Sequence, residues 1–118
     1  MAIISILGEK SMAFGKRIAK CYKFLNQQGM ERSLPNQLLR SGTSIGANVS
    51  EALSAQSRKD FVSKMTIALK EARETNYWLE VMHEADYFDH RAFLSLKADN
   101  DELIAMLTAT VKTSKKNM

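Results

Sequence analysis

The segment 40–51 constrains the fold more than any other part of the chain and reads Arg-Ser-Gly-Thr-Ser-Ile-Gly-Ala-Asn-Val-Ser-Glu. Its apolar and small residues recur at alternating steps of three and four, which is the period of a helix and not of a strand. Gly42 and Gly46 each cost about 1 kcal/mol relative to alanine inside a helix. A helix tolerates two glycines one turn apart where another backbone comes close. The segment is therefore predicted to lie inside a tightly packed central helix.

The same periodicity extends over nearly the whole chain of 118 residues and predicts four helices. Gly29 is placed to end the first helix, and Ser33 and Ser57 are placed as N-caps of the second and third. Residues 1–8 are expected to form a poorly ordered lead-in. The predicted helices cover about residues 9–28, 33–55, 58–85 and 90–112. Because the connections between them are short, we expect one all-α domain over residues 1–118, an antiparallel up-down-up-down four-helix bundle.

The third predicted helix supplies the most regular core stripe. Its small residues are expected to lie level with Gly42 and Gly46, so that the second and third helices pack closely. The run Asp99-Asn100-Asp101-Glu102 is a candidate kink or restart in the fourth helix. The predicted core stripe of the third helix is Phe61, Met65, Ala68, Ala72, Thr75, Leu79 and Met82.

Composition indicates a globular protein, with 45% apolar and 25% charged residues. A single cysteine, Cys21, excludes a disulfide within the chain, and no stretch approaches the roughly 20 apolar residues that span a bilayer. The run Ile3–Leu7 is short for a signal segment and has no basic residues before it. We therefore expect a soluble, cytoplasmic protein.

Charge is distributed unevenly along the chain, which carries a net charge of +4. Residues 1–59 hold nine Lys and Arg against three acids, whereas residues 60–118 hold eight against ten. Such asymmetry is compatible with an anionic partner. The lysines and Arg17 of the first helix form either a solvated face or an anion-binding stripe. The candidate nucleic-acid-binding residues are Lys16, Arg17, Lys20, Lys23, Arg58, Lys59, Lys112, Lys115 and Lys116.

Polar residues on the packed faces of the second helix suggest a buried network. Asn48 lies on an apolar stripe, and an unpaired buried amide would cost about 1–3 kcal/mol. Residues of the third helix, among them Thr75, could supply partners. The predicted network fixes helix register, with a ligand site as the alternative, and comprises Arg40, Ser44, Asn48, Glu51, Glu71 and Glu74.

Apolar residues also lie outside the core stripe of the third helix. One exposed apolar residue needs no explanation, but several on one outer face suggest a subunit interface. We expect self-association through Ile67, Tyr77, Trp78 and Val81.

Signatures of catalysis and metal binding are missing from the sequence. Glu71 and Glu74 show the Glu-x-x-Glu spacing, not the Glu-x-x-His of diiron bundles. His83 and His90 are seven residues apart, which is not a zinc-ligand spacing. Gly42-x-x-x-Gly46 is a packing pattern and not a phosphate loop. We expect no catalytic residue, no metal, no cofactor and no enzymatic activity.

Three motifs occur in order: residues 40–51, then Ser57-Arg58-Lys59-Asp60-Phe61, then residues 67–79 with Glu71-Ala-Arg-Glu74 and Tyr77-Trp78-Leu79. Over roughly residues 9–113 the chain resembles the bacterial four-helix-bundle proteins often encoded in intervening sequences of large-subunit ribosomal RNA genes. This resemblance implies a ring-shaped homopentamer without established enzymatic activity. Distant relatives, the accessory variability proteins of diversity-generating retroelements, bind nucleic acid and a reverse transcriptase. A more divergent branch has Pro at the position of Gly46 and Ile-Ala-Glu-Gly in place of residues 49–52.

The leading functional hypothesis is a non-enzymatic homo-oligomer that binds RNA or DNA through its basic faces. No exposed aromatic platform is expected beside the basic stripe, so binding is predicted to be mainly to phosphate. The alternative is an adaptor that recruits a protein partner through the acidic region 80–102, which holds seven acids and two Lys or Arg. A small-molecule enzyme is the third hypothesis and requires a pocket.

Overall fold

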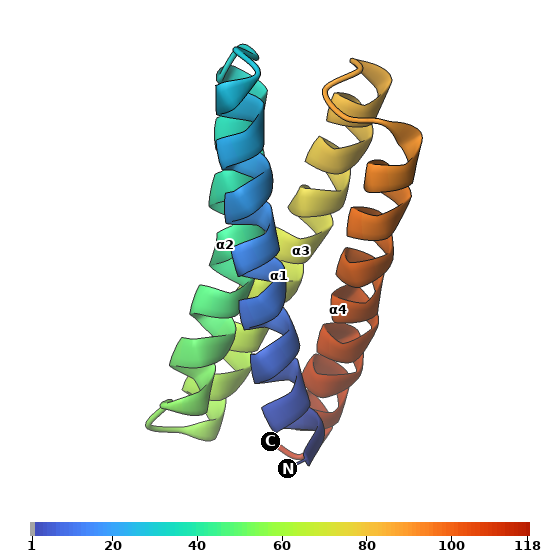
Figure 1. The fold of residues 1–118 in the computed structure, drawn as a ribbon. Coiled ribbons are helices and arrows are strands. Elements are labelled where there is room, and N and C mark those ends of the chain that lie inside the picture. Colours follow the sequence, from blue (N-terminus) through green and yellow to red (C-terminus); the bar gives the residue numbers. More distant parts are fainter. Residues whose placement is uncertain (1) are drawn as a thin grey trace.

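Residues 2–118, which the computed structural model describes, form four helices and contain no strand (Figure 1). The expectation of an all-α chain is confirmed. The helices form an elongated body of 47 × 21 × 20 Å. Among the described residues, no helix combines the length and the apolar character needed to cross a membrane. The helices are α1 (Ala2–Gln27), α2 (Ser33–Leu53), α3 (Arg58–Glu84) and α4 (His90–Lys116).

Each helix packs against its neighbours in the chain, and α1 also packs, over a smaller area, against α4. In Figure 1 the start of α1, the α2–α3 connection and the end of α4 are all at the bottom, with the α2–α3 connection on the left. The α1–α2 and α3–α4 connections are both at the top, on opposite sides. We call these the lower end and the upper end of the bundle.

The core lies along the axis between the four helices. On α3 the predicted stripe is buried from Met65 to Met82, and only Phe61, near the helix start, remains half-buried. Ile18 of α1, Ile45 of α2 and Leu107 of α4 are fully buried and face the same interior. The helical period therefore identified the α3 stripe correctly.

The prediction of a poorly ordered lead-in is wrong for residues 2–8, and Met1 lies outside the described residues. Residues 2–8 form the first two turns of α1, and Leu7 is completely buried. The cause is that Leu7, Ser11, Phe14 and Ile18 continue one helical stripe into the core. At the other end of the chain, α4 runs to Lys116, four residues past its predicted end.

The starts of α2 and α3 are stabilised in different ways. Ser57 caps α3 as predicted, since its hydroxyl accepts the Asp60 N–H at 3.0 Å. Ser33, by contrast, is the first residue of α2 and not its N-cap. There the Glu31 carboxylate accepts from both the hydroxyl and the backbone N–H of Ser33. These bonds favour the ionised form and hold the pKa of Glu31 below its ordinary value.

The two glycines of α2 contact α1 and not α3, which corrects the predicted pairing. A Cβ at Gly46 would come within 3.0 Å of the Ser11 carbonyl oxygen, and one at Gly42 within 3.0 Å of the Ile18 side chain. The close backbone approach predicted from the sequence therefore exists between α1 and α2. The predicted close packing of α2 on α3 is also present: within the described residues these two helices share the most extensive contact, which includes Ser41 and Thr75.

Candidate nucleic-acid interface

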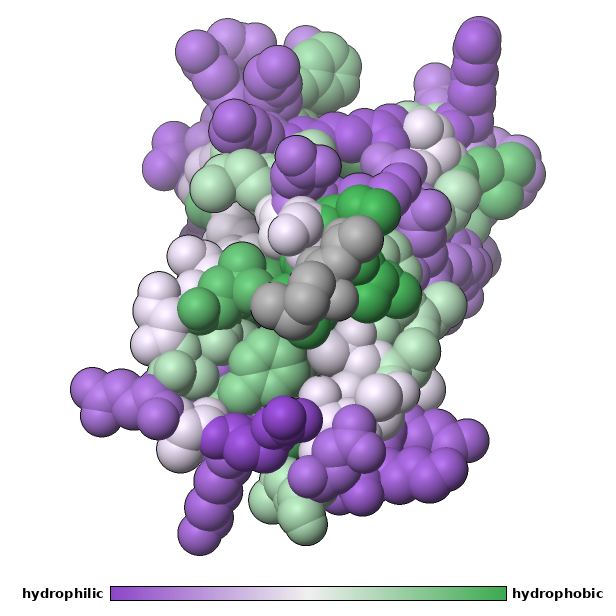
Figure 2. All heavy atoms as spheres, turned by 90° about the horizontal axis from the view of Figure 1, so that it is seen from below, coloured by the Kyte–Doolittle hydropathy of each residue, from purple (hydrophilic) through white to green (hydrophobic). Residues whose placement is uncertain are grey.

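Five of the nine predicted nucleic-acid-binding residues lie at the lower end of the bundle. Arg58 and Lys59 begin α3, and three lysines lie in the last turns of α4, which ends at the same end of the bundle (Figure 1). All five are exposed, and none forms an ion pair within residues 2–118. In Figure 2, which views this end directly, hydrophilic side chains surround a more apolar middle. We call Arg58, Lys59, Lys112, Lys115 and Lys116 the basic end.

The other predicted cations lie along α1, and they divide into two groups. Lys16, Lys20 and Lys23 are exposed and form no ion pair within the described chain. Arg17 instead bonds to α4, with Nη1 2.8 Å from Asp99 Oδ2 and Nη2 2.6 Å from Ser95 Oγ. Its donors are thus engaged in holding α1 to α4. Arg17 does not share the free, outward position of the three lysines.

The expectation that no exposed aromatic ring lies beside the basic stripe is wrong. Phe24 follows Lys23 directly, lies one helical turn after Lys20, and is 55% exposed. The helical period could have indicated this, because Phe24 falls outside the stripe formed by Phe14, Ile18 and Leu25.

The predicted polar network is divided into separate contacts at the surface. Arg40 pairs with Glu71 at 3.3 Å and with Glu74, but its side chain is 49% exposed. Ser44 and Asn48 bond within α2, Ser44 Oγ to the Arg40 carbonyl and Asn48 Nδ2 to the Ser44 carbonyl. A single buried network is therefore not formed.

Glu51 was also assigned to that network, and it pairs elsewhere. Its carboxylate lies 2.9 Å from Lys64 Nζ, nearer the start of α3. The hydrogen bond and charge of Glu51 raise the pKa of Lys64 above its ordinary value. Both groups lie at the surface. The pair joins α2 to α3 about three helical turns below Arg40.

Completely buried polar side chains include Thr75, which was named as a possible partner, together with Ser41 and Asn100, which were not assigned to the network. Ser41 and Thr75 are completely buried, and their hydroxyl oxygens are 2.9 Å apart. Asn100, in the run that was predicted to kink α4, is also completely buried in a continuous helix. Its Nδ2 donates to the Ala72 carbonyl at 2.8 Å and to Asn76 Oδ1 at 3.1 Å. The spacing Leu96, Asn100, Leu103, Leu107 was the signal for its burial.

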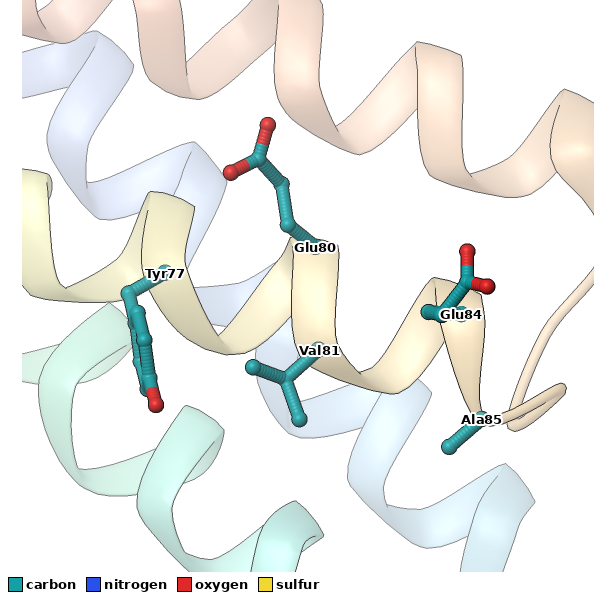
Figure 3. A pocket seen from close by; sticks show the side chains of 5 residues that line it. All are labelled: Tyr77, Glu80, Val81, Glu84 and Ala85. Atoms are coloured by element: carbon teal, nitrogen blue, oxygen red, sulfur yellow. The ribbon is translucent and has the colours of Figure 1, made fainter.

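The residues predicted to form a subunit interface lie on the outer face of α3. Tyr77 is 58% and Ile67 38% exposed, whereas Trp78 and Val81 are half-buried. The Trp78 Nε1–H donates to Glu74 at 2.9 Å, and the Tyr77 ring meets the Trp78 ring edge to face. Near the upper end of α3 there is an open pocket of about 450 Å³ (Figure 3). We call it the outer α3 pocket; it is lined by Tyr77, Glu80, Val81, Glu84 and Ala85.

Within residues 2–118, no group of three or more His, Cys, Asp or Glu is placed to hold a metal ion. His83 Nε2 lies 3.2 Å from His90 Nδ1, and the His83 ring stacks on the Phe93 ring near the α3–α4 connection. Cys21 lies partly within the core, where burial raises the pKa of its thiol against the opposing effect of Arg17.

Comparison with known proteins places the chain in a family. The family described as 23S rRNA-intervening sequence protein matches residues 6–109. A solved structure of a protein of unknown function from the S23 ribosomal protein family of Bacteroides thetaiotaomicron VPI-5482 is 44% identical. It aligns with a TM-score of 0.91 over 93% of this chain and 98% of its own. A comparison with curated proteins finds no match. The chain belongs to the 23S rRNA-intervening sequence protein family.

Proposed function

We propose that this protein is a non-enzymatic, cytoplasmic homo-oligomer that binds the phosphate backbone of nucleic acid through the basic end. The observation that carries the proposal is that Arg58, Lys59 and the three α4 lysines lie at the same end of the bundle, without ion-pair partners in the described chain. Cations that are free of carboxylates release phosphate counterions when they bind nucleic acid.

The proposed assembly is a ring of up-down-up-down bundles, with five subunits as the resemblance implies. In a ring whose axis is parallel to the bundles, the basic ends of all subunits lie on one rim. The modest charge of each subunit would then add to a strong local field. Binding would follow phosphate and shape more than base sequence, because the basic end offers cations and no aromatic ring among its five residues.

The test compares two variants that lose the same charge. The basic-end variant carries Lys59→Gln, Lys115→Gln and Lys116→Gln. The control variant carries Lys70→Gln, Arg73→Gln and Arg91→Gln, three exposed cations that also lack ion pairs in the described chain. Fluorescence anisotropy with a labelled structured RNA and a DNA duplex measures the dissociation constant of each variant over a salt series.

The basic-end variant is expected to bind at least about ten times more weakly at low salt. Its log–log salt slope is expected to fall by about one for each phosphate contact removed, and so by about three for each subunit that contacts the nucleic acid. The control should change the affinity by less than about threefold. Equal weakening in the two variants would show that only net charge matters and would overturn the assignment of the basic end.

An adaptor function is the second candidate, and the outer α3 pocket favours it. Glu80 and Glu84 flank apolar side chains there, which is a surface suited to a protein partner. Binding of neither nucleic acid at low salt would favour this candidate.

A further inference from the structure

The outer α3 pocket has two chemically different sides. Figure 3 shows Tyr77 and Val81 on one side of α3, with Tyr77 pointing toward α2, and Glu80 and Glu84 pointing to the opposite side, toward α4. Neither carboxylate forms an ion pair within residues 2–118. An occupant that fits this pocket therefore presents an apolar group with cations beside it.

The same chain carries such a group on α1. Phe24 is 55% exposed in the single chain. Phenylalanine is among the side chains most enriched in protein interfaces, so its exposed ring is available to be buried by a partner. Lys20 lies one turn before it on neighbouring surface, and Lys23 precedes it directly. Both lysines are exposed and have no carboxylate partner in the described chain. The Phe24 ring with its two lysines is complementary in charge and polarity to the pocket.

The two surfaces also lie at the same level of the bundle. Phe24 is three residues before the last residue of α1, Gln27, and Val81 is three residues before the last residue of α3, Glu84. Both helices end at the upper end of the bundle (Figure 1). They belong to helices that are not neighbours in the packing, so the two surfaces face different directions. Rotation about an axis parallel to the bundle therefore brings one surface onto the other without a shift along the axis.

We infer that Phe24 of one copy inserts into the outer α3 pocket of a second copy, with Lys20 and Lys23 facing Glu80 and Glu84. The contact joins two different surfaces, so it is heterologous, and repeating it closes a ring when the rotation allows. Burial of the Phe24 ring supplies the affinity, and the charge pairs at the rim set register and speed association. This inference rests on the proposed ring and names its contact. It leaves the basic end, at the opposite end of the bundle, free for nucleic acid.

Four variants test the contact by sedimentation velocity at micromolar protein and low salt. Phe24→Ser removes the inserted ring, and Val81→Arg fills the pocket. Lys20→Glu with Lys23→Glu, and Glu80→Lys with Glu84→Lys, reverse the charges on the two sides. The matched control is Leu94→Ser, which removes a 50% exposed apolar side chain of α4 outside both surfaces. Far-UV circular dichroism verifies that each variant remains folded.

The wild type and Leu94→Ser are expected to form the same oligomer. Phe24→Ser and Val81→Arg should weaken association at least about tenfold. Each charge-reversed chain should associate more weakly by itself. An equimolar mixture of the two should recover association, because every contact between unlike chains again pairs opposite charges. Since two chains cannot alternate around a closed ring of five, recovery is measured as the formation of mixed dimers and larger oligomers. Recovery by mixing is not expected from a merely structural defect.

Failure of the inference is distinguishable from failure of the proposed function. A wild-type oligomer that persists in both Phe24→Ser and Val81→Arg would overturn this contact and leave the ring intact. A wild type that stays monomeric would overturn both the ring and the contact. Anisotropy on that monomer would then show whether the basic end binds nucleic acid by itself.

Discussion

The carbonyl oxygen of Ser11 in α1 lies so close to Gly46 in α2 that a Cβ at Gly46 would come within 3.0 Å of it. A backbone carbonyl inside a helix cannot move away without moving the helix. Gly46 is therefore required by the α1–α2 approach, despite its low helix propensity.

Gly46→Ala is predicted to lower the free energy of unfolding by about 1–3 kcal/mol, because overpacking outweighs the gain in helix propensity. The control is Gly15→Ala, where the nearest atom to a new Cβ, the Cα of Thr43, is 3.9 Å away. That variant should gain up to about 1 kcal/mol. Urea unfolding, monitored by circular dichroism, measures the free energy of unfolding of both variants. Equal stabilisation by the two alanines would contradict the close approach.

The buried hydroxyl pair of Ser41 and Thr75 is predicted to couple α2 to α3. A double-mutant cycle with Ser41→Ala and Thr75→Val should give a coupling free energy of about 0.5–1.5 kcal/mol, because the hydrogen bond at 2.9 Å is shielded from water. The measurement is urea unfolding of the four proteins in the cycle. Strictly additive effects would show that the two hydroxyls act independently.

Arg40 is predicted to contribute much less, despite its two carboxylate partners. Arg40→Ala should cost no more than about 1 kcal/mol, since the exposed pair is screened by water and salt. Thermal melts at low and high salt test this, and the difference from wild type should shrink as salt rises. A large loss that salt does not change would restore the buried network that the sequence suggested.

Asn100→Asp is predicted to lower the free energy of unfolding by about 3–5 kcal/mol, because it places a charge in a fully buried position without a cation partner. The control is Asn36→Asp on the exposed side of α2, where the Tyr22 hydroxyl donates to Asn36 Oδ1 and can donate equally to a carboxylate. That variant should change the stability by less than about 0.5 kcal/mol. Urea unfolding at neutral pH distinguishes the two. Similar small losses would indicate that water reaches Asn100.

Cys21 is predicted to react slowly with thiol reagents in the folded protein. Burial raises the pKa of its thiol, so the reactive thiolate is scarcer than in the unfolded chain at the same pH. Because the pKa of Cys21 is higher in the folded than in the unfolded chain, this thiol favours the folded state at a pH below its ordinary pKa. That contribution to stability is lost as the pH rises through the pKa of the folded state. A colorimetric thiol reagent, with and without denaturant at mildly alkaline pH, should show at least about a tenfold difference in rate. Equal rates would contradict the burial.

Helical period located most of the fold, because it reports which residues share a face. The buried stripe from Met65 to Met82 on α3 was found in this way. The helical period does not report which neighbouring helix covers a given face. Gly46 was therefore predicted to face α3, whereas it contacts α1.

The errors at the site have a related physical origin. Arg17 was grouped with the lysines by charge, but its partner Asp99 lies 82 residues away and only the fold brings them together. Asn100 stands among acids in the sequence, although its spacing from Leu96 and Leu103 places it in the core. Arg58 and the α4 lysines lie at the same end of the bundle because α3 begins where α4 ends. Composition does not report where helix ends lie in space.

Salt-dependent binding by the wild-type protein tests the central claim most directly. A labelled structured RNA and a matched DNA duplex are titrated by fluorescence anisotropy at several salt concentrations. We predict micromolar or tighter binding, with the logarithm of the affinity falling linearly and steeply with the logarithm of salt, as phosphate contacts require. Absence of binding to both nucleic acids at low salt would contradict the proposed function.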